Sequence, residues 1–264
     1  MAEFTLTVLG TRGSMAVDGA DYTLFGGATS CYMIRAGEET VFWDAGSGLI
    51  RAEVDFPKPP VILISHLHLD HLLGLGMYPR LTRKGLETRI CVPASDGADA
   101  EAGLNQLYSP PLWPVSMKLY AGDIRVEELS LPMRLGEVLI EGMAGSHPGD
   151  CVIMKLSYKG RSVVYMTDYE HQERFSDPLI DFVREADLVL YDGQYKVDEY
   201  ETKKGFGHST VEKGAELMDQ ASIRKMLIVH HDPQSTDEIL LEREKAIGRK
   251  DIRFARQGET IELL

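Results

Sequence analysis

Apolar and polar residues alternate over many short segments of this chain, which is typical of β-strands, and helical patterns appear mainly late. The apolar run Val61–Ile64 predicts a buried strand, and the capping box Ser209–Glu212 predicts a helix that reaches Ala221. We expect strands at 4–9, 31–36, 40–44, 61–64, 89–92, 124–129, 138–142, 152–158, 162–166, 187–191 and 226–229. We expect helices at 71–78, 79–84, 178–186, 209–221 and 236–247, and a loop at 93–115.

This order of elements predicts a mixed α/β fold, with sheets covered by helices, rather than a regular series of βαβ units. No linker or internal repeat divides the sequence, so we expect one domain over residues 1–264. No apolar stretch approaches the ~20 residues of a membrane span, and no signal peptide is visible at the start. Three widely spaced cysteines fit reduced, packed thiols in a cytoplasmic protein.

The formal net charge of −13 bears on the class of partner. Proteins that bind a long polyanion usually present a basic surface, so we do not expect a long nucleic acid as the substrate. A small nucleotide stays compatible with this charge, because metal ions and a few local donors can bind one phosphate.

The segment Ser65–His71 is the strongest chemical signal, because it places metal-capable side chains at the carboxyl end of a predicted strand. His66 and His68 alternate, so in extended backbone they project to the same side and can bind one ion. Asp70 and His71 are adjacent and point differently, which suits a second ion nearby. The motif therefore predicts two metal ions and requires further ligands from elsewhere in the chain.

Three more residues occupy the same kind of position, directly after a short apolar strand: His147, Asp168 and His230. Each signal is weak by itself. A histidine in a turn such as Gly145–Gly149 usually faces solvent, and an aspartate after a strand is commonly a turn or N-cap residue. Their shared position is what makes them candidate ligands.

With these residues in place, the sequence resembles the metallo-β-lactamase superfamily of metal-dependent hydrolases over nearly its whole length. Its opening segments Leu9–Ser14, Gly26–Cys31 and Asp44–Gly48 are also similar to the first motifs of that superfamily. The resemblance implies a four-layer αββα sandwich with the metals at one edge. It implies a first metal held by His66, His68 and His147, a second held by Asp70, His71 and His230, and Asp168 as the bridging ligand.

The element Gly207-His208-Ser209-Thr210 resembles the phosphodiesterase branch, which includes tRNA 3′-processing nucleases and the cyclic-phosphate phosphodiesterase of phosphonate breakdown. In that branch the histidine contacts the phosphate and assists the leaving group, so His208 and Asp168 are the expected catalytic residues. The short segment between His147 and Asp168 lacks the tRNA-gripping arm typical of the nucleases. Ala28 departs from the family pattern, where many relatives carry Asn, so a hydrogen bond in that loop and the substrate are expected to differ.

The resemblance predicts hydrolysis of a small phosphodiester, a cyclic nucleotide or a cyclic sugar phosphate, by a hydroxide that bridges two divalent cations. Zinc is the first choice of metal, and manganese or iron also suits such ligands. A lactone, thioester or amide hydrolase and a non-catalytic metal-binding sensor are the alternatives. A homodimer is compatible with the sequence.

We expect structural roles for most of the remaining polar candidates. We expect Asp44 to orient the ligand loop, Asp192 to act as a turn or supporting residue, and His231 to face away from the metals. We expect His171 at the surface. Arg12 is equally suited to a phosphate or to one of the many acidic residues, and it is not counted in the site.

Overall fold

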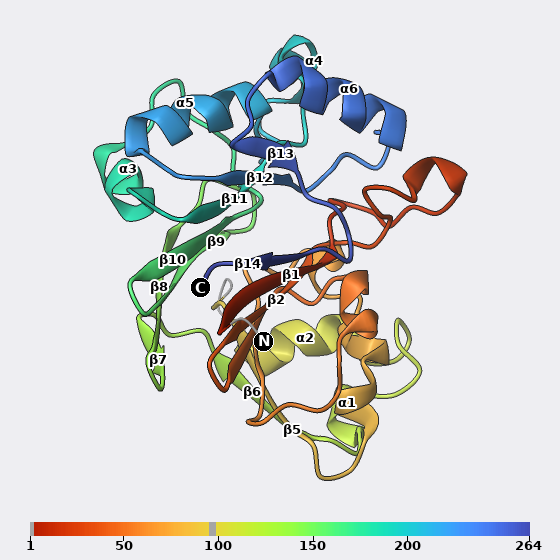
Figure 1. The fold of residues 1–264 in the computed structure, drawn as a ribbon. Coiled ribbons are helices and arrows are strands. Elements are labelled where there is room, and N and C mark those ends of the chain that lie inside the picture. The colour runs from red at the N-terminus through yellow and green to blue at the C-terminus, as the bar shows by residue number, and fades with distance from the viewer. Residues whose placement is uncertain (1–2, 95–98) are drawn as a thin grey trace.

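Two β-sheets lie against each other in the computed structural model, which describes residues 3–94 and 99–264 (Figure 1). In the described residues each sheet has seven strands. The first sheet has the order β14 (Thr260–Glu262), β1 (Phe4–Gly10), β2 (Cys31–Ala36), β3 (Glu39–Trp43), β4 (Val61–Leu63), β5 (Glu87–Val92) and β6 (Asp123–Glu128). The second has the order β13 (Ile252–Phe254), β12 (Met226–Val229), β11 (Leu188–Asp192), β10 (Arg161–Met166), β9 (Val152–Tyr158), β8 (Val138–Ala144) and β7 (Met133–Leu135).

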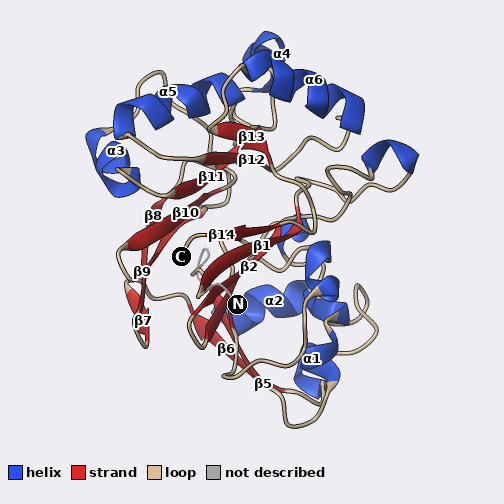
Figure 2. Cartoon of the chain, in the orientation of Figure 1, coloured by secondary structure: helices blue, strands red, loops and turns tan. Residues whose placement is uncertain are grey.

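Helices cover the outer face of each sheet (Figure 2). The first sheet carries α1 (Pro79–Thr82) and α2 (Ala100–Leu107). The second carries α3 (Asp177–Val183), α4 (Val197–Lys203), α5 (Val211–Ala221) and α6 (Asp237–Ile247). The predicted four-layer αββα arrangement is therefore confirmed. Among the helices described, none is both long and apolar enough to cross a membrane.

Strand alternation divides the buried residues among three layers of core. On β11, Leu188 and Leu190 face the opposite sheet, whereas Val189 and Tyr191 face the helices of the second sheet. On β4, Val61 and Leu63 also face the opposite sheet. Continuous apolar runs therefore mark strands that are covered on both faces, as the sequence predicted for β4.

Several predicted elements differ in the structure. The helix expected at 71–78 is instead two 3₁₀ turns, Leu69–His71 and Leu75–Met77. The loop expected at 93–115 contains α2, whose N-cap Asp99 accepts a hydrogen bond from the Ala102 N–H. Residues 95–98 of that loop lie outside the described residues. Sequence patterns did not predict β7, β13, β14 or α4, which are all short.

The direction of the strands sets the place of the candidate ligands. β3, β4, β5 and β6 run parallel in the first sheet, and β10, β11, β12 and β13 run parallel in the second. Parallel strands end at the same edge of a sheet. The loops that follow β3 and β4 therefore lie beside each other, as do those that follow β10, β11 and β12.

Replacement of Leu190 by alanine tests the shared core. Its side chain is fully buried between the sheets, so Leu190→Ala should lower the free energy of unfolding by about 2–5 kcal/mol. Leu241→Ala, on the exposed side of α6, should change it by less than about 0.5 kcal/mol. Urea unfolding followed by circular dichroism measures both values. Equal effects of the two substitutions would contradict the assignment of Leu190 to the core.

Candidate metal centre

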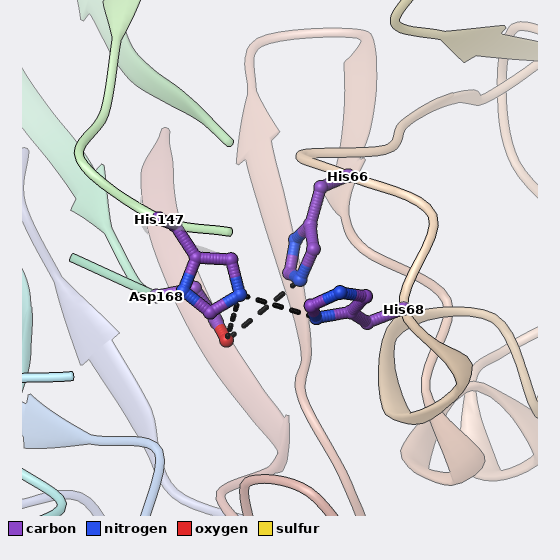
Figure 3. A group of neighbouring side chains, drawn as sticks. All are labelled: His66, His68, His147 and Asp168. Carbon is purple, nitrogen blue, oxygen red and sulfur yellow. Dashed lines mark hydrogen bonds and ion pairs between the residues drawn. The ribbon is translucent and has the colours of Figure 1, made fainter. Parts of the chain in front are cut away.

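Four side chains from three loops converge in a first group of metal-capable residues, His66, His68, His147 and Asp168 (Figure 3). His147 Nε2 lies 3.1 Å from His68 Nδ1 and 3.7 Å from Asp168 Oδ1. His66 Nε2 also lies 3.7 Å from Asp168 Oδ1. Zinc bonds of about 2.0–2.2 Å place tetrahedral ligands a little more than 3 Å apart, so this spacing suits one cation.

A second group lies directly beside the first and contains Asp70, His71 and His230. His71 Nε2 lies 3.1 Å from Asp70 Oδ2, and His230 Nε2 lies 3.2 Å from the same oxygen. All three residues are buried. The structure thus separates the residues of the Ser65–His71 segment into two groups, as their spacing suggested.

Asp168 faces both groups. Its Oδ2 lies 3.2 Å from His71 Nε2, while its Oδ1 lies 3.2 Å from His230 Nε2. Asp168, Asp44 and His230 all have positive φ, at 49°, 58° and 58°. This left-handed conformation is uncommon outside glycine and clusters at functional sites. Each residue follows a strand closely, so the conformation turns the chain out of the sheet and keeps the side chain at the shared edge.

The pKa directions show that the second group attracts positive charge. Burial lowers the pKa of His230, but Asp168 and Asp70 outweigh burial and raise it to about 9. Burial likewise opposes protonation of His71, yet three carboxylates raise its pKa well above the usual value. In the first group, burial holds the pKa of His66 well below its usual value, so that ring is neutral and can donate a lone pair.

The buried polar atoms fit metal ions at this place. His66 Nε2 is buried and has no hydrogen-bond partner in the described part of the chain. His71 Nε2 lies close to oxygens of Asp70 and Asp168 but makes no well-directed hydrogen bond to either. A buried imidazole nitrogen normally finds a partner, and both atoms point into the groups of carboxylate and imidazole atoms described above. A divalent cation in each group would satisfy these nitrogens and would balance the two buried carboxylates.

Four orienting contacts hold the opposite ring nitrogen of candidate ligand histidines. Asp44 Oδ2 lies 2.6 Å from His71 Nδ1 and also accepts from the hydroxyls of Ser65 and Tyr165. The remaining contacts run from His66 Nδ1 to Ser65 Oγ, from His147 Nδ1 to Gly207 O, and from His230 Nδ1 to Gln194 Oε1, at 3.0, 2.9 and 2.7 Å. Such partners fix the ring orientation and tautomer of metal-binding histidines.

His208 lies next to these groups and is paired with a buried carboxylate. Its Nδ1 lies 2.8 Å from Asp192 Oδ2 and 3.9 Å from Asp168 Oδ1. The His208 ring stacks on the His230 ring at a centroid distance of 4.7 Å. Asp168, Asp192, His208 and His230 also have atoms close enough together to hold an ion, so geometry alone permits His208 as an acid or as a ligand.

One expectation about the other polar residues was wrong. His171 is buried, with its Nδ1 2.7 Å from Ser209 Oγ and its ring stacked on Tyr200. Arg12, which the sequence left outside the site, is buried and donates to three backbone oxygens, those of Gly26, Asp232 and Ser235. His231, by contrast, is buried against Ala255 O and points away from the metal-capable groups, as expected.

Sequence reasoning missed supporting residues whose partners are distant in the chain. Glu170 accepts hydrogen bonds from the N–H groups of Gly205 and Gly207. Arg243 donates to the carbonyl oxygens of residues 193, 194 and 195, which lie beside Asp192. Neither residue type signals this role. Gln194, which contacts His230 Nδ1, was missed as well, and its position two residues beyond a strand-end aspartate is the one local signal that could have found it.

The loop around Ala28 is held through the backbone of that residue. The Ala28 N–H donates to Gln257 Oε1 at 3.0 Å, and the Ala28 carbonyl accepts from the N–H groups of Thr11 and Arg12. These three bonds use the backbone of residue 28 and need no polar side chain there.

Substitution of Asp44 tests its orienting role. Asp44→Asn replaces an oxygen that accepts from His71 Nδ1 with an amide group, so affinity for the second metal should fall roughly 10–100-fold. Titration against a chelator with elemental analysis measures this change. Asp181→Asn, at an exposed carboxylate of α3, is the control. Unchanged metal affinity in Asp44→Asn, with the fold intact by circular dichroism, would exclude this role.

Comparisons with known proteins agree with this geometry. The Beta-lactamase superfamily domain matches residues 28–231. Ribonuclease Z of Thermoplasma acidophilum is 32% identical, covering 76% of this chain and 80% of that protein. Probable metallo-hydrolase YhfI of Bacillus subtilis is 23% identical, covering 88% of this chain and 91% of that protein.

A crystal structure of a diphosphatase from the PhnP family has a similar fold, with a TM-score of 0.72 at 18% identity over 99% of this chain and 98% of that one. At this identity the likeness bears on the fold alone. The family match extends the likeness to the sequence, over a range that includes the loops with the metal-capable residues, and the ribonuclease Z relative supports the same family. The chain belongs to the β-lactamase superfamily and is a metal-dependent hydrolase of that superfamily.

Proposed function

We propose that the protein is a phosphodiesterase with two metal ions that hydrolyses a small phosphodiester. The observation that carries this proposal is the place of Asp168 between two groups of histidines, with the His208–Asp192 pair 3.9 Å away. Two adjacent cation sites suit phosphoryl chemistry, because they can neutralise charge on the oxygens of a phosphate. His208, a residue type that can donate a proton, lies beside the two cation sites.

Seven residues would hold the metals. The first ion would take His66, His68 and His147, the second Asp70, His71 and His230, and Asp168 would be shared. Bound divalent ions would supply Lewis acidity and lower the pKa of water toward neutrality. We propose zinc for both ions, because imidazole and carboxylate ligands suit it, although manganese and iron accept the same ligands.

His208 is placed to assist the leaving group. If Nδ1–H donates to Asp192, the other ring nitrogen, Nε2, is left to face the substrate. When that nitrogen is protonated, it can donate to the oxygen that departs from phosphorus. The N-terminus of α5, capped by Thr210, begins just after His208, and its partial positive charge favours an anion nearby.

The size of the substrate is argued from the chain between His147 and Asp168. Strands β9 and β10 and their tight turn take up most of this segment, and no separate arm extends from it in the described residues. With the net charge of −13, this compact hairpin supports a small phosphodiester rather than a long nucleic acid. The name ribonuclease Z belongs to relatives and does not assign tRNA to this chain.

Hydrolysis of bis-p-nitrophenyl phosphate compared with a chromogenic β-lactam tests the proposal. The metal-loaded protein should hydrolyse the phosphodiester, and Asp168→Ala should abolish turnover because it removes the carboxylate that both groups share. Elemental analysis of each sample accompanies the assay. Near-wild-type turnover in Asp168→Ala, or turnover of the lactam alone, would refute the assignment.

His208→Ala distinguishes an acid from a ligand. As an acid, its loss should lower kcat roughly 10²–10⁴-fold and leave two metals bound. Asp192→Asn keeps the shape of its partner and should lower kcat in the same direction, because the hydrogen bond to Nδ1 changes. If His208→Ala loses metal instead, the residue is a ligand and its role as an acid is wrong.

A further inference from the structure

Phe206 is unusual among the aromatic residues of this chain. All 8 Phe, 11 Tyr and 2 Trp residues lie in the described part of the chain, and Phe206 alone is exposed, with 63% of its surface accessible. A large aromatic side chain left in water forgoes the burial that stabilises the others. An exposed ring of this kind is suited to contact a bound partner molecule.

The backbone on both sides of Phe206 is firmly held. The Glu170 carboxylate accepts from the N–H of Gly205 at 2.8 and 3.0 Å and from the N–H of Gly207 at 2.8 Å. The Phe206 N–H itself donates to Lys203 O at 3.3 Å. A ring presented from a fixed backbone loses little conformational entropy when it binds.

This loop lies against the metal centre. The Gly207 carbonyl accepts from His147 Nδ1, and a Cβ atom on Gly207 would lie only 1.9 Å from that nitrogen. The Cα atoms of Phe206 and Gly207 are about 3.8 Å apart across a trans peptide bond. His208 follows Gly207 directly, so Phe206 precedes both the glycine that contacts His147 and the candidate acid.

Two further exposed apolar residues adjoin the same groups from other loops. Leu69, 47% exposed, lies between His68 and Asp70. Met15, 58% exposed, follows Ser14, whose N–H donates to Asp70 Oδ2. Exposed apolar residues are therefore direct chain neighbours of residues that form or contact the polar centre, and small-molecule sites commonly combine apolar side chains with a few polar groups.

We propose that Phe206 is a specificity-determining residue that stacks on a planar ring carried by the substrate, and that the substrate is a nucleoside phosphodiester rather than a cyclic sugar phosphate. This inference rests on the proposed phosphodiesterase function. Stacking on an aromatic face accepts any base and needs no positive charge, so it suits this acidic protein. Leu69 adds an apolar contact, and Met15 adds a flexible thioether of the kind that contacts aromatic rings favourably.

Binding of two matched monophosphates tests the proposal without depending on turnover. Adenosine 5′-monophosphate and ribose 5-phosphate share the phosphate and the sugar, and only the first has a base. Calorimetry on the metal-loaded protein should give a Kd about ten-fold lower for the nucleotide. Phe206→Leu stays apolar but lacks a planar face, and should remove most of this ratio. Phe206→Trp should keep it, and Leu241→Ala on α6 should leave it unchanged.

The outcomes separate this proposal from the phosphodiesterase assignment. Equal Kd values for the two ligands in the wild type, or an unchanged ratio in Phe206→Leu, would overturn the stacking role. Equal weakening of both ligands would also overturn it, because Phe206 would then act through His147 or His208. A third outcome would separate the two proposals: the wild type prefers the nucleotide and Phe206→Leu removes this preference, but bis-p-nitrophenyl phosphate is not hydrolysed. The stacking role would then stand, and the phosphodiesterase function would be wrong.

Discussion

Two buried carboxylates, Asp70 and Asp168, face a set of imidazole rings, and the balance of charge among these groups governs the whole site. Buried carboxylates are unfavourable without positive charge close to them. In the second group the raised pKa values of His71 and His230 show that protons can supply that charge. A divalent cation would have to displace those protons, so metal binding and acidity are linked here by the arrangement of the ligands themselves.

The two sheets bring the Ser65–His71 segment together with residues that are distant from it in the sequence. Asp44 and His66 follow adjacent parallel strands of the first sheet. In the second sheet Asp168 follows β10, Asp192 ends β11 and His230 follows β12, which are three consecutive parallel strands. The fully buried core between the sheets then keeps the two edges in register. The metal centre is therefore a consequence of strand direction, and the short loops only need to turn each side chain toward the shared edge.

This dependence explains which parts could be predicted from the sequence. His66, His68, Asp70 and His71 are visible because their spacing is local, and His147, Asp168 and His230 because each follows an apolar strand. Glu170 and Arg243 could not be found in this way, since their partners are backbone atoms of distant loops. The burial of His171 was not predicted for a related reason. It depends on contacts with Tyr200 and Ser209, which are distant in the sequence. The short strands β13 and β14 are fixed by neighbouring strands rather than by their own pattern.

One loop links three parts of the proposed reaction through its backbone. The Gly207 carbonyl orients His147, the next residue is His208, and the preceding residue is Phe206. Gly207 has a φ of 91°, and its close approach to His147 leaves no room for a side chain. Because Glu170 fixes the N–H groups on both sides of Phe206, the positions of ligand, acid and ring are set together. Metal affinity, protonation of the leaving group and recognition of the substrate are therefore not independent properties of this site.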